Sequence, residues 1–283
     1  MTGTFSRMFR IELQKALGRR FPWIGVAVLV ALMSFFYVVF FLFRGNIPAS
    51  GTRFLYWPDS LIYGLGYASG YASWTSYGTY LLIALVGVSV GQEYGWRTLQ
   101  LWLGHGVSRR TVLAAKMLLS LGLAVGIVVL CVLVVAAISG VFSLVVHGGV
   151  AFASVNPGQL VAGVARTAFS MLPYAALTFL LAVATRSTLV AIGGAIAFVA
   201  VLETALLQIL PHLGAVLDRI VQFLPAGLSS ALNAPNAAIA GSTALTTGSQ
   251  PTPVEAAIVI AIYAAILSGL TFIVFERQDL TQA

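Results

Sequence analysis

Residues 21–43 read FPWIGVAVLVALMSFFYVVFFLF, an apolar run that carries no charged side chain and ends at Arg44. A helix needs roughly 20 apolar residues to cross the ~30 Å hydrocarbon core of a bilayer, so this run is long enough to span it. It exceeds the roughly 7–15 apolar residues of a secretory signal peptide, and no Ala-x-Ala cleavage site follows it. We therefore expect a retained membrane span here.

The rest of the chain has the same apolar character. Hydrophobic residues make up 59% of the 283 residues, charged residues make up 8%, and the mean hydropathy is +0.97. A soluble domain is about 25% charged and a disordered chain is poor in apolar residues, so this composition excludes both classes. The single cysteine, Cys131, excludes an intrachain disulfide. The main solvent of this chain is therefore lipid.

Five further apolar segments have the length of a membrane span. The fold class that we expect is an all-α polytopic membrane protein with six transmembrane helices. Residues 92–111 then form a cytoplasmic loop, residues 211–253 an external segment and residues 277–283 a cytoplasmic tail. The predicted spans cover about residues 21–43, 72–91, 112–137, 160–184, 189–210 and 254–275.

The distribution of basic residues predicts the orientation of these spans. Lys and Arg gather in cytoplasmic loops. Eleven of the fifteen bases lie in segments that six spans place on one side of the membrane, and three lie on the other side. We therefore expect both termini in the cytoplasm and a multi-pass protein of the cell (plasma) membrane, namely the inner membrane of a bacterium. This arrangement explains the net charge of +7 without nucleic acid as a partner.

Residues 1–20 precede the first span and contain an amphipathic pattern of helical period. Apolar residues recur three or four positions apart, and most of the bases face elsewhere, which is typical of a helix lying on the inner leaflet. The alternative is a simple basic anchor that orients the first span. The residues assigned to this interfacial helix are Phe5, Phe9, Arg10, Leu13 and Lys15.

Two external segments differ in composition. In the first, Tyr63, Tyr67 and Tyr77 belong to an aromatic series at helical spacing, which favours either an interfacial belt or an aromatic wall that contacts substrate. In the second, residues 212–224 predict a short amphipathic helix, and residues 225–253 predict an irregular loop.

Three glycines of the second span, Gly87, Gly91 and Gly95, are each four residues apart. This spacing leaves one helix face without side chains, so it predicts close packing against another helix.

Two ionisable residues fall well inside the predicted spans. Arg166 and Glu203 lie at matching depth on successive antiparallel helices, in the outer half of the bundle. A charge in a bilayer needs a partner or a wet surface, so we expect these two to form an ion pair. The alternatives are that Glu203 contacts a proton, a cation or the substrate, or that both side chains reach the membrane surface.

The loop after the second span reads QEYGWRTLQLWLGHGVSRRTVLAAK over residues 92–116 and has a clear internal pattern. A short amphipathic stretch is followed by a Gly-His-Gly break, and Ser108 then caps the helix of the third span. One interpretation is a basic loop that only enforces topology. The other is a short helix parallel to the membrane that docks a cytoplasmic partner.

This loop and the six-span plan together resemble the type-2 permease subunits of bacterial ATP-binding-cassette exporters (ABC-2 permeases). The end of the chain, from Phe275 to Leu280, is similar to the Phe-x-Arg-x-Asp tail of that family. Gly106 departs from the family pattern, which commonly has proline there. The residues that carry the resemblance are Glu93, Gly95, Thr98, Leu99, Leu103, Val107, Ser108, Arg109 and Lys116.

The resemblance implies a homodimer, or a pair of paralogous permeases, with two ATPase subunits docked on the cytoplasmic side. Those subunits would hold ATP and Mg, so this chain itself binds no cofactor. The resemblance further implies that charge reversal at Arg109 and Arg110 uncouples transport from ATP hydrolysis and leaves membrane insertion intact. The residues implied in coupling to the ATPase are Glu93, Gly95, Arg97, Thr98, Leu99, Trp102, Leu103, Ser108, Arg109 and Arg110.

No catalytic or metal site is expected from the sequence. It contains neither the G-x-x-x-x-G-K-[ST] phosphate loop nor an H-E-x-x-H zinc motif, so we expect a transport subunit rather than an enzyme. The exported compound would be a lipid, a peptide or another amphipathic compound. The rival functions are a secondary transporter or channel that uses Arg166 and Glu203, and a membrane scaffold or immunity protein that transports nothing.

Overall fold

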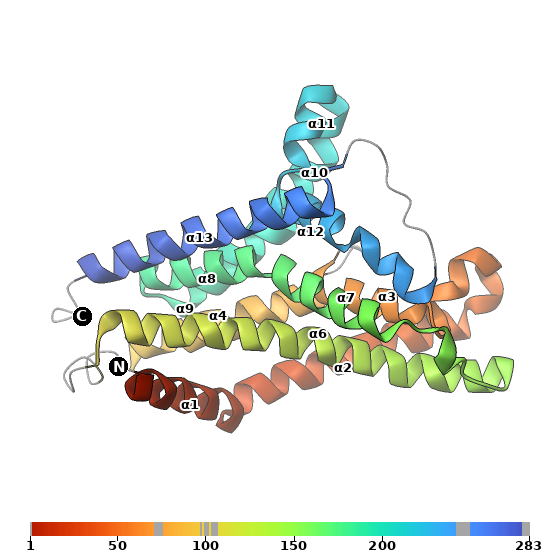
Figure 1. Ribbon diagram of the computed structural model, residues 1–283, viewed down its shortest axis with the longest axis horizontal. Coiled ribbons are helices and arrows are strands. Elements are labelled where there is room, and N and C mark those ends of the chain that lie inside the picture. Colours follow the sequence, from red (N-terminus) through yellow and green to blue (C-terminus); the bar gives the residue numbers. More distant parts are fainter. Residues whose placement is uncertain are drawn as a thin grey trace.

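A computed structural model describes residues 2–70, 76–96, 98, 102, 107–241 and 250–278. Every regular element within these ranges is helical. The N- and C-terminal ends lie at the same end of an elongated helical bundle (Figure 1). The α-helices are α1 (Thr2–Gly18), α2 (Arg20–Leu42), α3 (Ser60–Ser69), α4 (Tyr77–Gly95), α6 (Arg109–His147), α7 (Pro157–Ser170), α8 (Leu172–Thr185), α9 (Thr188–Ala197), α10 (Thr204–Ile209), α11 (Ala215–Val221), α12 (Pro225–Asn233) and α13 (Pro253–Arg277).

Shorter helical turns connect these helices. A π-helix, η4 (Phe198–Glu203), continues α9 into α10. The remaining elements are the 3-10 helices η1 (Arg44–Asn46), η2 (Ala49–Leu55), η3 (Phe152–Ser154), η5 (Leu210–Leu213) and η6 (Ala234–Ala240).

Five helical stretches among the described residues are long and apolar enough to cross a membrane. They correspond to the predicted first, third, fourth, fifth and sixth spans, which makes the chain an all-helical protein with several membrane-compatible helices. The predicted second span, 72–91, is not among these five. The helix at that position, α4, starts at Tyr77 after the non-helical Ser76, and residues 72–75 lie outside the described ranges. The five stretches are Arg20–Leu42, Arg109–His147, Pro157–Thr185, Thr188–Leu213 and Pro253–Arg277.

The position of α4 explains its lower hydropathy. It contacts α6, α8 and α9, and most of its residues are buried. By contrast, α2 and α13 expose long apolar side chains, among them Trp23 and Ile258. A helix surrounded by protein can carry small and polar residues, whereas a lipid-facing helix must be apolar.

Two of the three predicted packing glycines lie at close helix contacts. A Cβ atom at Gly87 would lie 2.5 Å from Ile192 of α9, and one at Gly91 would lie 2.6 Å from the Cα of Thr188. Gly95 is different, because it is exposed and no described atom lies within 4 Å of the position of its Cβ. The spacing of four therefore predicts a packing role for Gly95 that the described structure does not show, since α4 ends there.

The helix α6 is longer than the predicted span 112–137. Its 39 residues extend about 58 Å, which exceeds the bilayer core. The Ser108 side chain caps its start, and Gly148 ends it with a positive φ of 70°. The far part of α6 packs against α3, and a Cβ at Gly64 of α3 would lie 3.2 Å from the Cα of Val132. Within the segment between the first two spans, residues 60–69 therefore form a mostly buried helix and not only an interfacial loop.

The expectation of an irregular loop over residues 225–253 is wrong for residues 225–240. These residues form α12 and η6, which pack on α7 and α13. The side chains of Asn233 and Asn236, which suggested a loop, are buried and hydrogen-bonded: Asn233 accepts from the Thr167 hydroxyl at 2.9 Å and donates to the Ser229 carbonyl at 2.8 Å, and Asn236 donates to Asn233 at 3.0 Å. The short helix α11 lies within the predicted range 212–224 and projects from the bundle (Figure 1).

Candidate functional site

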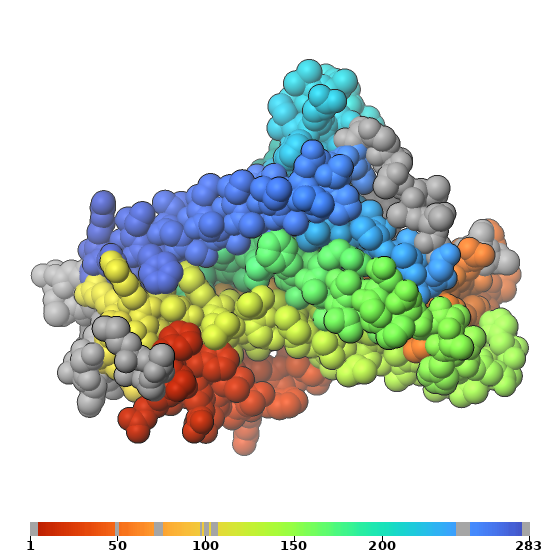
Figure 2. All heavy atoms as spheres, in the orientation of Figure 1, coloured from red at the N-terminus to blue at the C-terminus, as the bar shows by residue number. Residues whose placement is uncertain are grey.

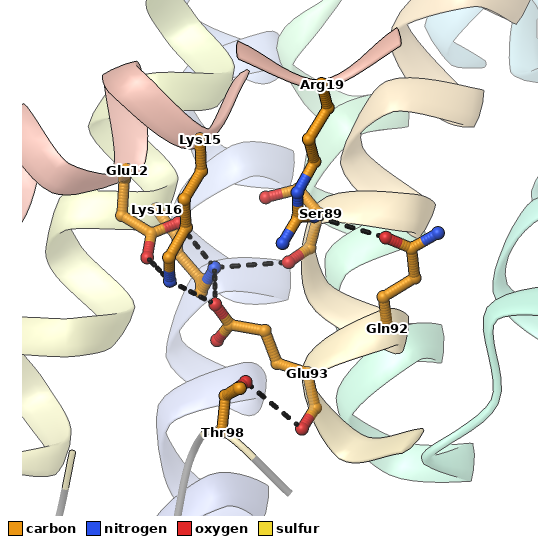
Figure 3. A network of polar contacts seen from close by, with 8 residues as sticks. All are labelled: Glu12, Lys15, Arg19, Ser89, Gln92, Glu93, Thr98 and Lys116. Carbon is orange, nitrogen blue, oxygen red and sulfur yellow. Dashed lines mark hydrogen bonds and ion pairs between the residues drawn. The ribbon is translucent and has the colours of Figure 1, made fainter. Parts of the chain in front are cut away.

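Four charged side chains from three helices form one cluster at the end of the bundle that holds both termini (Figure 3). Lys116 of α6 lies 2.7 Å from Glu12 of α1 and 3.1 Å from Glu93 of α4. Lys15 of α1 lies 2.9 Å from each of the same two carboxylates. We call Glu12, Lys15, Glu93 and Lys116 the charge cluster.

The charge cluster is buried and electrically balanced. Glu12, Glu93 and Lys116 are 2%, 1% and 3% exposed, and Lys15 is about a quarter exposed. Taking a charge out of water costs several kcal/mol per ion, which only close partners of opposite sign offset. Two acids and two bases meet this requirement, so each member depends on the others.

The electrostatics of α1 follow from the same contacts. Burial by itself would raise the pKa of Glu12, but Lys116 and Lys15 outweigh it and hold that pKa below its ordinary value. Burial would lower the pKa of Lys15, but Glu93 and Glu12 raise it above its ordinary value. Both shifts favour the charged forms.

Helical spacing brings these side chains to the cluster. Met8 and Glu12 are four residues apart on the buried face of α1, and Lys15 follows three residues later. Lys116 lies two turns after the start of α6 and also donates to the carbonyl of Ser89 at 3.1 Å. The charge cluster therefore joins α1 to the last turns of α4 and the first turns of α6. Figure 2 shows α1, in red, lying against the first part of α6, in yellow.

The predicted interfacial helix is consequently divided between two environments. Phe5 and Phe9 pack against the protein core, while Arg10 is exposed. Leu13 and Leu17 of the predicted apolar stripe are 38% and 56% exposed. One part of the stripe thus packs against protein, and these two leucines are left at the surface.

The predicted coupling loop lies directly beside the charge cluster. Thr98 donates to the carbonyl of Glu93 at 3.5 Å, and Lys15 lies 5.3 Å from the ring centroid of Trp102. Ser108 accepts from the backbone N–H of Thr111 at 3.2 Å and caps α6, as its position predicts. The predicted coupling residues Arg97, Leu99 and Leu103 lie outside the described residues.

Arg109 and Arg110 contact the end of α13. Arg109 donates to the carbonyl oxygens of Phe275, Glu276 and Gln278 at 2.9, 3.2 and 2.8 Å. Arg110 forms a 2.6 Å salt bridge with Glu276, and its side chain is 78% exposed. Arg109 therefore stabilises the last turn of α13, so charge reversal there would loosen α13 as well as alter the surface of the loop.

The predicted ion pair between Arg166 and Glu203 is not among the salt bridges of the described residues. Arg166 donates to Asn236 Oδ1 at 3.0 and 2.7 Å. Glu203 accepts from the hydroxyl of Tyr174 at 2.8 Å and from the backbone N–H of Ala226 at 2.6 Å. Residues 225–240 cause this change, because they fold into the bundle and supply one partner to each side chain.

The sequence-based site omits Glu12, and it includes Lys116 only through the family resemblance. The signal for Glu12 is present: it is the only acid within residues 1–20, and it lies four residues after Met8 of the apolar stripe. An isolated acid on the apolar face of a basic helix indicates a buried cation on a neighbouring element.

The described residues form neither a metal site nor a nucleophile elbow. Within the described part of the chain, no group of three or more His, Cys, Asp or Glu side chains could hold a metal ion. Residues 87–91 read Gly-Val-Ser-Val-Gly, the spacing of a nucleophile elbow, but they lie inside α4 and not on a strand-to-helix turn.

Comparison with known proteins gives one match. A family model with the description "Protein of unknown function (DUF2705)" matches residues 27–281. No curated protein and no solved structure matches the chain.

Proposed function

The chain belongs to the DUF2705 family of proteins of unknown function, and from its sequence pattern and its charge cluster we propose that it is the permease subunit of an ATP-binding-cassette exporter of the ABC-2 type. A separate ATPase subunit would hydrolyse ATP with Mg, and a second permease copy or a paralogue would complete the membrane part. The exported compound would be a lipid, a peptide or another amphipathic compound.

The observation that carries this proposal is the charge cluster. Glu93 lies at the start of the loop 92–111 and Lys116 lies just after its end; from α1, Lys15 binds Glu93 and Glu12 binds Lys116. A displacement of the loop would therefore move α4 and α6 together, because α1 fixes the distance between the end of α4 and the start of α6. An element that receives force from a partner needs such a rigid connection to the helices that it moves.

We further propose that α4 also crosses the membrane, as the second span along the chain, which brings the number of spans to six. Its 19 residues extend about 28 Å, close to the bilayer core. Six crossings agree with the position of both termini at one end of the bundle (Figure 1). The cytoplasmic side would then be the end that carries the charge cluster and the loop, in a cell membrane of bacterial type.

Site-specific cross-linking tests the docking of the ATPase. In a Cys131→Ala background, Arg110→Cys places a thiol at the exposed start of α6, and Phe152→Cys places one beyond the opposite end of α6. Each variant is co-expressed with a candidate ATP-binding-cassette ATPase subunit and treated with a short bifunctional maleimide. We expect a cross-linked product with Arg110→Cys and none with Phe152→Cys.

Co-purification provides the second measurement. Wild-type chain should retain the ATPase through affinity purification and should raise its rate of ATP hydrolysis. A chain that neither retains the ATPase nor cross-links to it would reject the exporter assignment and favour a secondary transporter or a scaffold.

A further inference from the structure

A cavity of about 250 Å³ lies where α3, α4, α8, η4, α10 and α12 approach one another, and none of its described lining residues belongs to the charge cluster. Among the described residues that line it, Glu203 is the only one with a charged side chain, and Tyr80 and Tyr174 contribute aromatic rings. Ser69, Ser76 and Gln208 add further oxygen atoms. The cavity thus combines one carboxylate, two aromatic rings and several neutral polar groups.

Glu203 has hydrogen-bond donors but no cationic partner within the described structure. It is 1% exposed, and its two oxygens accept from Tyr174 and Ala226. Each carboxylate oxygen can accept a second hydrogen bond, so capacity remains for a ligand. A buried carboxylate without a counter-charge is costly in a membrane helix, and such residues mark substrate or ion sites.

Ser69 provides an independent observation at the same cavity. It is 7% exposed, and its hydroxyl has no hydrogen-bond partner among the described residues. Buried hydroxyls are nearly always hydrogen-bonded, so one that lines a cavity without a partner indicates a ligand that supplies the contact.

The backbone at Glu203 is also unusual. Residues Phe198–Glu203 form a π-helix, and the Thr204 hydroxyl donates to the carbonyl of Val199, five residues earlier, at 3.0 Å. Such π-turns within α-helices occur frequently at functional sites because the extra residue reorients side chains. Here the turn ends at Glu203, the one charged residue of the cavity.

We propose that this cavity binds the ammonium group of an amphipathic amine. The ammonium would pair with Glu203 and donate to Ser69 Oγ, and the rings of Tyr80 and Tyr174 would face it, since aromatic faces attract cations. The described lining residues include Glu203 and no Lys, Arg or His, which favours a cation over an anion. As a statement about the exported compound, this inference rests on the proposed function.

Binding of benzylammonium tests the proposal, with benzyl alcohol as a neutral probe of similar shape. The full chain is placed in nanodiscs of zwitterionic lipid, and calorimetric titration is corrected with empty nanodiscs. We expect wild-type chain to bind benzylammonium at least about tenfold more tightly than benzyl alcohol, since one buried charge pair is worth at least that factor.

Glu203→Gln should abolish this preference. Glutamine retains the size of the side chain, its amide oxygen can accept from the Ala226 N–H and its NH2 group can donate to the Tyr174 hydroxyl, so the variant separates charge from packing. Glu255→Gln is the matched control, because Glu255 is an exposed carboxylate in the capping box of α13; this variant should bind as wild type does. Ser69→Ala breaks no hydrogen bond, so it should fold normally and weaken benzylammonium binding by about threefold to tenfold.

Equal binding of the two probes by wild type, or unchanged binding in both Glu203→Gln and Ser69→Ala, would overturn the proposal. The outcome is separable from that of the cross-linking experiment. A chain that binds benzylammonium through Glu203 but contacts no ATPase retains this site and loses the exporter assignment. A chain that cross-links to the ATPase but does not bind benzylammonium retains the exporter assignment and loses this site.

Discussion

Buried charges in this protein depend on partners that are far away in sequence. Lys116 binds Glu12, which is 104 residues distant, and Arg166 binds Asn236, which is 70 residues distant. Charge and depth in the sequence correctly indicate that such side chains need partners. They cannot identify the partner, because several polar groups lie at similar depth and only packing selects among them.

Lys116→Met should be the most disruptive single change in the charge cluster. It leaves Glu12 and Glu93 buried with Lys15 as their only base, and breaking a buried pair costs about 3–5 kcal/mol of unfolding free energy. The measurement is the temperature at which Cys131, buried and the single thiol, reacts with a fluorogenic maleimide.

Two comparisons control this experiment. Lys15→Met should lower the reaction temperature less, because Lys15 is partly solvated. Adding Glu12→Gln to Lys116→Met should recover part of the loss, since it removes one of the uncompensated carboxylates. If Lys116→Met and Lys15→Met had equal effects, the cluster would not act as a buried unit.

At the scale of elements, α4 and the segment 225–240 depart most from their sequence patterns. Both are less apolar than a lipid-facing helix, and both pack against other helices. Hydropathy predicts whether a helix is apolar enough to lie against lipid. A helix that is surrounded by other helices can carry small and polar residues, so its hydropathy is lower. Packing against other helices also explains why residues 225–240, which are rich in Ser, Asn and Pro and so predict a loop, form α12 and η6.

Gly91→Ala should destabilise the contact between α4 and α9. A Cβ there would approach the backbone of Thr188, which cannot move aside as a flexible side chain can. Overpacking of this kind costs about 1–3 kcal/mol. Gly95→Ala is the matched control in the same helix, and its stability should equal or slightly exceed that of wild type. Thiol reactivity on heating measures both, and a Gly91→Ala variant as stable as Gly95→Ala would show that the contact is loose.

At the scale of the whole molecule, the number of spans decides whether the two termini lie on the same side of the membrane. Five crossings would place the termini on opposite sides of the membrane, whereas six place them together. The bundle brings both termini to one end (Figure 1), and the bases are most numerous in the segments at that end. The orientation proposed above follows from these two facts and the positive-inside rule.

Labelling of intact cells tests this orientation. In the Cys131→Ala background, a membrane-impermeant maleimide should label Phe152→Cys on intact cells, and should label Arg110→Cys only after the cells are permeabilised. The two residues lie near opposite ends of α6, whose length of about 58 Å exceeds the bilayer. Labelling of Arg110→Cys from outside would reverse the proposed orientation and remove the basis for an ATPase at that end.

The sequence by itself determines that the chain is a helical protein suited to a membrane, and it locates five of the membrane-compatible helices and the cap at Ser108. These features depend on length, hydropathy and neighbouring residues, which are local properties. Only the tertiary structure decides that Glu12 completes the charge cluster and that Glu203 faces a cavity without a base. The physical reason is that partners of buried charges come from distant segments, whose packing no local pattern encodes.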